Sequence, residues 1–135
     1  MKRILALVVA ASALFIGGCS TSAGAVQTLD PQAFLQMASR SGTTTVDVRT
    51  PLEYQSGHLS DAVNIDVEGP GFSSTIARMD KSGTYLVYCH SGRRSTLAAD
   101  AMEQAGFLHV YNLHGGFADL QAAAATTSSS PLALH

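Results

Sequence analysis

One of the two thiols in the sequence, that of Cys89, begins the segment Cys89-His90-Ser91-Gly92-Arg93-Arg94-Ser95. A hydrophobic run over residues 84–88 precedes it and an amphipathic segment follows it, which predicts a loop between a buried strand and a helix. Such a loop aims successive backbone N–H groups inward at the positive end of the helix, where an anion is stabilised. We expect the Cys89 thiolate to be that anion, because Arg93 and Arg94 should lower the thiol pKa further.

An alternative interpretation is that Cys89 is a small buried hydrophobic residue at the end of a strand, and that both arginines simply face solvent. Arginines at a helix N-terminus oppose the helix dipole, so the pair costs stability unless an anion is bound there. Gly92 permits the tight backbone that such an anion site requires. The sequence therefore favours a nucleophilic cysteine.

The elements that must position this loop alternate between strands and helices. Asp30 followed by Pro31 is a typical helix start, with apolar residues at helical spacing up to Ala38 and Gly42 at the end. Strands that alternate with helices imply a parallel or mostly parallel sheet covered on both faces, so the predicted fold class is α/β. Further strands are predicted over residues 44–48, 62–66, 84–88 and 109–111, and further helices over 51–55, 72–79 and 95–105.

The helix predicted over residues 95–105 is amphipathic. Leu97, Ala101 and Ala105 lie on one face of it, and Gly106 is a plausible C-terminal stop.

The end of the chain changes in composition. From Ala122 it consists mainly of alanine, threonine and serine, which cannot bury enough apolar surface to offset the entropy of ordering. We therefore expect one domain over residues 29–121, followed by a disordered tail over 122–135.

Three motifs resemble those of the rhodanese family. The cysteine loop is similar to the rhodanese active-site loop, and residues 113–117 (Leu-His-Gly-Gly-Phe) resemble the glycine pair and aromatic residue near the end of that domain. Residues 47–65 resemble the motif D-V-R-x-x-x-E-[YF]-x-x-G-H-[IL]-x-x-A-x-N-[IL]. Because the motifs occur in the right order and spacing, the chain is identified as a member of the single-domain rhodanese-like (thiosulfate sulfurtransferase) family.

This resemblance implies a five-stranded, mostly parallel sheet with helices on both faces, and an enzyme that carries sulfur as a persulfide on Cys89. A small-molecule donor such as thiosulfate would give its outer sulfur to Cys89 and release sulfite. A thiophilic acceptor, cyanide or a thiol, would then collect the sulfur in a ping-pong scheme. No cofactor and no metal are implied.

The resemblance also suggests roles for the residues around Cys89. The N–H groups of the loop would hold the persulfide and the two arginines would attract the anionic donor, so the predicted substrate-binding residues are His90, Ser91, Gly92, Arg93, Arg94 and Ser95. An ionised thiolate needs no obligatory general base. We therefore expect a structural role, through charged hydrogen bonds between loops, for Asp47, Arg49, Glu53 and His58.

Two other functions compete with sulfur transfer. The related cell-cycle dual-specificity phosphatases place an arginine six positions after the cysteine, whereas here Ser95 occupies that position and Arg94 the one before it. The shorter loop suits a persulfide sulfur better than phosphate oxygens. The other candidate is a non-catalytic rhodanese-like module for binding or sensing. Loss of the cysteine would favour this candidate, but Cys89 is present.

The N-terminal segment predicts export. Lys2 and Arg3 precede an uncharged, mostly apolar run over residues 4–16, which matches the charged and hydrophobic regions of a signal peptide. The run is too short for a membrane-spanning helix, which needs about 20 apolar residues. Residues 16–19 resemble a bacterial lipobox, so we expect a signal peptide over 1–18 and lipidation of Cys19.

Lipidation would place the protein on the periplasmic side of a bacterial membrane, because several acyl chains give stable anchoring. The resemblance of Ser20 to a sorting residue favours the outer membrane. Residues 19–28 are small and polar and would form a flexible tether. With a formal net charge of −2 for the whole chain, a basic surface for nucleic acid is not expected.

Overall fold

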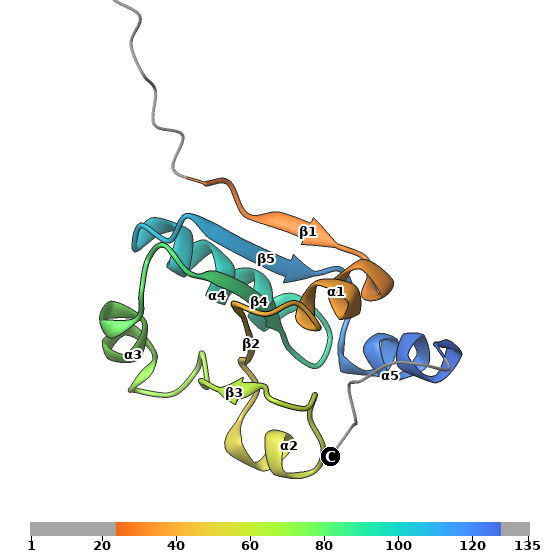
Figure 1. Cartoon of the computed structure of the whole chain (residues 1–135). Helices are drawn as coiled ribbons and strands as arrows, with labels where there is room; N and C mark the ends of the chain where they lie inside the picture. Colours follow the sequence, from red (N-terminus) through yellow and green to blue (C-terminus); the bar gives the residue numbers. More distant parts are fainter. Residues whose placement is uncertain (1–23, 128–135) are drawn as a thin grey trace, which may run out of the picture.

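The computed structural model describes residues 24–127, which form a five-stranded sheet whose neighbouring strands are all parallel (Figure 1). The strand order is β1-β5-β4-β2-β3. The strands are β1 (Gln27–Leu29), β2 (Thr43–Asp47), β3 (Val63–Asn64), β4 (Thr84–Tyr88) and β5 (His109–Leu113). The predicted α/β fold class is confirmed, and the sheet is parallel throughout.

Helices cover both faces of the sheet. The helices are α1 (Pro31–Ala38), α2 (Pro51–Gln55), α3 (Phe72–Arg78), α4 (Arg93–Gln104) and α5 (Phe117–Thr126). One face carries α3 and α4, whose buried core residues are Phe72, Ile76, Ala98, Ala99 and Met102. The opposite face carries α1 and α5, which contribute Phe34, Leu35, Phe117 and Leu120.

The central strand β4 is buried on both sides. Tyr85 and Val87 point into the core beneath α3 and α4, whereas Leu86 and Tyr88 point into the core beneath α1 and α5. A strand covered on both faces has apolar residues at consecutive positions, which is why this run shows no alternation of polar and apolar residues. It leads directly into Cys89.

Local capping fixes where the helices near the site begin. Thr50 and Glu53 form a capping box at the start of α2, in which the Glu53 carboxylate accepts from the Thr50 backbone N at 3.0 Å. The loops after β2 and β4 lie at the same edge, because parallel strands all end on one side of the sheet. The segment around Thr50 is thereby brought next to the loop that begins at Cys89.

The structure corrects two predicted domain boundaries. Gln27 and Thr28, predicted to be part of the tether, belong to β1, which pairs with β5. Residues 122–126, predicted to be disordered, form the last turns of α5. Side chains hold this end of the helix, since Gln32 Nε2 donates to the Ala123 carbonyl at 3.2 Å and to Thr126 Oγ1 at 3.1 Å.

The predicted apolar face of the fourth helix is also wrong. Leu97 is 54% exposed, and the buried side of α4 is formed by Ser95, Ala98, Ala99 and Met102. The packing of α4 on the sheet turns these small residues toward the strands, and Ala101, from the predicted face, is only partly buried. Alanines allow α4 to lie close to the strands at this point.

The predicted signal peptide, Cys19 and the tail beyond Thr127 lie outside the described residues. Within residues 24–127, none of the helices is long and apolar enough to cross a membrane.

Candidate active site

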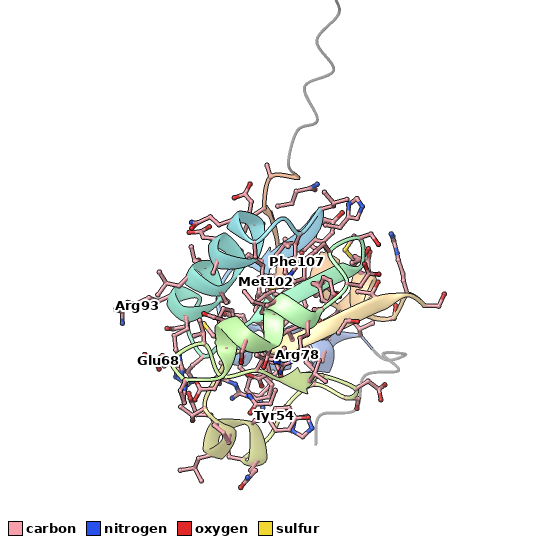
Figure 2. All side chains as sticks on the ribbon, turned by 90° about the vertical axis from the view of Figure 1, so that its left-hand side faces the viewer. Tyr54, Glu68, Arg78, Arg93, Met102 and Phe107 are labelled. Carbon is pink, nitrogen blue, oxygen red and sulfur yellow. The ribbon has the colours of Figure 1, made fainter. Side chains whose placement is uncertain are left out.

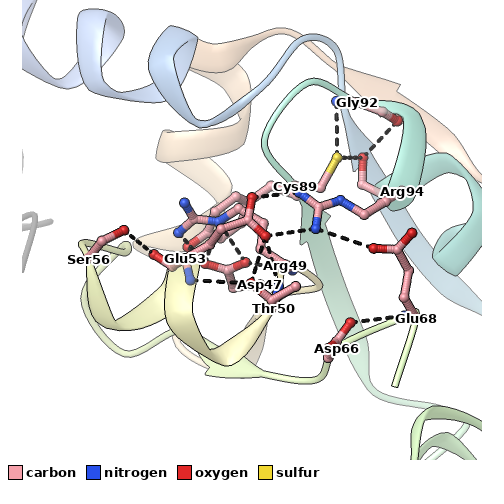
Figure 3. Close-up of polar contacts among 12 residues, drawn as sticks. Asp47, Arg49, Thr50, Glu53, Ser56, Asp66, Glu68, Cys89, Gly92 and Arg94 are labelled. Atoms are coloured by element: carbon pink, nitrogen blue, oxygen red, sulfur yellow. Dashed lines mark hydrogen bonds and ion pairs between the residues drawn. The ribbon is translucent and has the colours of Figure 1, made fainter. Parts of the chain in front are cut away.

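Cys89 lies directly after β4, with its side chain in the core beneath α4. Its Sγ accepts a hydrogen bond from the backbone N of Gly92 at 3.0 Å and lies 3.5 Å from the Oγ of Ser95 (Figure 3). The Ser95 hydroxyl donates to the Gly92 carbonyl at 3.1 Å in this arrangement. Cys89 is 0% exposed, so the loop encloses its sulfur.

The loop lowers the pKa of Cys89 below the ordinary value of a thiol. Burial by itself raises this pKa, because a thiolate is poorly solvated in the interior. The opposing contributions are larger in sum: they come from the Ser95 hydroxyl and from the backbone N–H groups of Ser95, Ser91 and Gly92. Of the loop N–H groups predicted to surround the sulfur, that of Gly92 forms a hydrogen bond to it, at 3.0 Å.

Two glycines allow the loop to close around the sulfur. Gly92 caps α4 with φ +96°, a left-handed conformation that glycine adopts without steric cost. Gly116 lies against the loop so closely that a Cβ there would be 1.8 Å from the carbonyl O of His90. The next residue holds the loop from the same side, since Phe117 N donates to the Cys89 and His90 carbonyls at 3.0 and 3.2 Å.

Arg94 lies between two carboxylates beside the cysteine loop (Figure 3). Its terminal nitrogens donate to both carboxylate oxygens of Glu53, at 2.7 and 2.8 Å. Nη1 is also 3.6 Å from the Oε2 of Glu68. The hydrogen bond to Glu53 is the main reason that the pKa of Arg94 is raised, with smaller contributions from the charges of Cys89 and Glu68.

The same pair affects Glu53. The hydrogen bond from Arg94 lowers the pKa of Glu53 to about 2, against the opposing effect of burial and with help from Thr50. Glu53 therefore joins the start of α2 to the start of α4 as a charged group.

Arg93 differs from its neighbour. Its side chain is exposed and extends away from the fold (Figure 2), and it forms no ion pair with the residues that the structure describes. His90 and Ser91 are also exposed, at the outer side of the loop. The predicted substrate-binding residues thus form two groups. His90, Ser91 and Arg93 are exposed, whereas Gly92, Arg94 and Ser95 are partly or fully buried.

Asp47 and Arg49 form a buried ion pair behind the loop. Arg49 Nη2 donates to Asp47 Oδ2 at 2.6 Å and to the Gly57 carbonyl at 2.7 Å. Asp47 Oδ2 also accepts from the hydroxyl of Tyr88 at 2.7 Å, and the Arg49 guanidinium stacks 4.2 Å from the centre of the Phe117 ring. The network joins the end of β2 to Tyr88, the last residue of β4, and to Phe117, the first residue of α5. Tyr88 immediately precedes Cys89 in the chain.

The remaining motif residues close the same loops. His58 Nδ1 is 2.8 Å from the Tyr54 carbonyl, and the two rings stack at 3.7 Å between centroids. Asn64 Nδ2 donates to the carbonyls of Asp47 and Arg49 at 3.0 and 2.8 Å. Their contacts lie within the motif and do not include the cysteine loop.

Sequence reasoning missed the roles of Glu68, Tyr88 and Phe117. A buried tyrosine usually finds a partner for its hydroxyl, so Tyr88 at the end of an apolar strand carried a usable signal. Glu68 carried none, because an acidic residue in a glycine-rich segment is typical of any exposed loop. Within the described part of the chain, no three His, Cys, Asp or Glu side chains are grouped so that they could hold a metal ion.

Comparison with known proteins gives consistent matches. The family model described as "Rhodanese-like domain" matches residues 30–123. Thiosulfate sulfurtransferase PspE of Escherichia coli is 37% identical over 75 residues, which are 56% of this chain and 71% of that protein. A tRNA uridine(34) hydroxylase of Cytophaga hutchinsonii is 36% identical over 91 residues, which are 65% of this chain and 29% of that protein.

A solved structure agrees in fold. The Rhodanese_3-like domain of the Alr3790 protein from Anabaena sp. superimposes with a TM-score of 0.57 at 27% identity. The alignment covers 67% of this chain and 98% of that domain.

Proposed function

The chain belongs to the family of rhodanese-like domains, and we propose that it is a sulfurtransferase that carries sulfur as a persulfide on Cys89. The single observation that supports this most strongly is the position of the Cys89 sulfur, which accepts the Gly92 N–H at 3.0 Å at the centre of the loop. A relative of 37% identity is named a thiosulfate sulfurtransferase, which agrees with the proposal.

In the first half-reaction, the Cys89 thiolate attacks the outer sulfur of a sulfane donor such as thiosulfate. A sulfur–sulfur bond to Cys89 forms, the bond between the two sulfurs of thiosulfate breaks, and sulfite leaves with its electron pair. In the second, cyanide or a thiolate attacks the outer sulfur of the persulfide, which restores the Cys89 thiolate and releases thiocyanate or the acceptor's persulfide. Neither step transfers a proton to or from the protein, so no general base is required.

The loop supplies stabilisation for the negative charge in both half-reactions. The N–H groups of Ser91, Gly92 and Ser95 that lower the thiol pKa are fixed before the reaction, so they can stabilise the outer sulfur of the persulfide without reorganising. Because Cys89 is 0% exposed, the atoms that cover it must shift before a donor reaches its sulfur. Arg93, which is exposed in the same loop, is suited to attract an anionic donor.

Arg94 has a different role in the proposal. Glu53 occupies both of its terminal nitrogens, so we assign it a positioning role at the first turn of α4. The same pair argues against phosphatase chemistry, since an arginine held by a carboxylate on both nitrogens is not free to bind phosphate oxygens.

Mass measurement tests the proposal. Residues 20–135, incubated with thiosulfate and then freed of excess donor, should gain the mass of one sulfur atom, and cyanide should remove it as thiocyanate. Cys89→Ser should gain nothing. If the wild-type protein gains no sulfur but hydrolyses aryl phosphates, the phosphatase assignment replaces ours. If it does neither, a non-catalytic binding or sensing module is the better assignment.

We further propose that the domain is tethered at the periplasmic face of a bacterial membrane by a lipid on Cys19. The lipobox-like residues 16–19 support this, together with the small polar residues that follow. The full chain expressed in Escherichia coli should partition with membranes and incorporate labelled palmitate, and Cys19→Ser should do neither. Labelling of the variant equal to that of the wild type would contradict the proposal.

A further inference from the structure

Glu68 lies beside the site although it belongs to none of the motifs. It follows β3 in a loop, its side chain is 62% exposed, and its Oε2 is 3.6 Å from Nη1 of Arg94 (Figure 3). Figure 2 shows Glu68 and Arg93 on the same side of the molecule. The carboxylate therefore lies beside the group of charges that an incoming sulfur donor meets.

The charged groups around the sulfur carry one more negative charge than positive charges. Arg93 and Arg94 contribute two positive charges, whereas Glu53, Glu68 and the Cys89 thiolate contribute three negative ones. Glu53 is tied to Arg94 by two short hydrogen bonds and to Thr50, so its charge is a fixed part of the fold. Glu68 makes the longer contact and is the more exposed of the two carboxylates, at 62% against 32%.

We propose that Glu68 selects the sulfur donor by its charge, and that it disfavours dianionic thiosulfate relative to sulfane donors with one negative charge or none. This rests on the proposed sulfurtransferase function. The physical reason is that the repulsion between Glu68 and the donor is proportional to the donor's charge. The Glu68 carboxylate also offsets part of the positive charge of Arg94, which would otherwise attract the donor.

Two donors of the same chemistry and different charge test this. Thiosulfate carries two negative charges, and methanethiosulfonate carries one; each gives its outer sulfur to the thiolate, with sulfite or methanesulfinate as the leaving group. The rate of sulfur loading on Cys89 is measured by intact mass in single turnover, with no acceptor present. The readout is the second-order rate constant for each donor.

Glu68→Gln should raise the rate constant by about four-fold for thiosulfate and about two-fold for methanethiosulfonate at low ionic strength, because the change in free energy doubles when the donor charge doubles. Both increases should shrink in high salt. Glu68→Asp retains the charge and should keep most of the wild-type preference. Glu103→Gln, which removes the same charge at the far end of α4, should change neither rate constant.

Three results would overturn the inference. Equal acceleration of both donors by Glu68→Gln would show an effect on access and not on charge. A slower reaction with both donors would make Glu68 a support for Arg94. No change with either donor would remove it from the site. In each case wild-type loading persists and the proposed function stands, whereas a wild-type protein that loads no sulfur from either donor refutes both proposals.

Discussion

Glu53 and Arg94 face each other as an ion pair with two hydrogen bonds, of 2.7 and 2.8 Å, between the first turn of α2 and the first turn of α4. The same Glu53 carboxylate accepts from the Thr50 backbone N at 3.0 Å. One acidic side chain thus caps one helix and fixes the start of another. Its loss should affect both stability and the geometry of the cysteine loop.

Glu53→Gln should weaken the dependence of stability on pH in acid. The folded-state pKa of Glu53 is lowered to about 2 from 4.5, so its stabilisation is present above pH 4.5 and is lost as the pH falls toward 2. Because a third of the side chain is exposed, we expect it to contribute about 1 kcal/mol. Urea unfolding of wild type and variant at pH 7 and pH 3 measures the difference, with Glu103→Gln as the control. An identical loss in wild type and Glu53→Gln would contradict this account.

Asp47→Asn should destabilise the fold strongly. The change leaves the buried guanidinium of Arg49 without its counter-charge, which typically costs about 3–5 kcal/mol. Tyr88→Phe removes one hydroxyl from the same network and should cost about 1–2 kcal/mol. Both free energies of unfolding can be measured by urea titration at pH 7. A smaller effect for Asp47→Asn than for Tyr88→Phe would show that the ion pair is not the main contributor.

Gly116→Ala should displace the cysteine loop. Its Cβ would be 1.8 Å from the His90 carbonyl O, a distance that only a backbone shift can relieve. We expect a cost of about 1–3 kcal/mol and a clear loss of sulfur loading on Cys89. Gly71→Ala is the matched control, because a Cβ there has nothing within 4 Å. Normal loading by Gly116→Ala would mean that the loop tolerates this displacement.

Ser95→Ala should raise the pKa of Cys89 toward the ordinary thiol value. The hydroxyl of Ser95 is one of the groups that outweigh burial, so its removal lets burial act with less opposition. At pH 7 a smaller fraction of Cys89 is then thiolate and sulfur loading slows, whereas at high pH the rates converge. The pH profile of single-turnover loading measures this, with Ser73→Ala on α3 as the control. Parallel profiles for wild type and Ser95→Ala would refute the role of the hydroxyl.

The order of elements from α1 to β5 and the position of Cys89 after β4 could be predicted from the sequence, because both depend on local patterns. The hydrophobic run before Cys89 and the residues that follow it are adjacent in the chain, so their types alone indicate a strand, a tight loop and a helix. Asp30, which precedes Pro31, is likewise a local signal for a helix start. Boundaries were less predictable, as β1 and the end of α5 depend on pairing and packing with distant segments.

The buried face of α4 shows the limit of periodicity. Leu97 suggested an apolar face, but the packing of the helix on the sheet selected Ala98, Ala99 and Met102 instead. Alanines contribute little to a hydrophobic pattern in the sequence, but their small side chains allow the helix to pack close to the sheet.

What the sequence by itself determined is the local setting of Cys89: a cysteine at the end of a buried strand, with glycine and hydroxyl residues in the loop that follows. What the tertiary structure decided is which charged side chains lie beside the cysteine loop. Glu53, Glu68 and Arg94 come from three separate segments, and their distances depend on how parallel strands place their ends along one edge of the sheet. Electrostatic interactions depend on distance in space, which is why the pairing of Arg94 could not be predicted from its position in the chain.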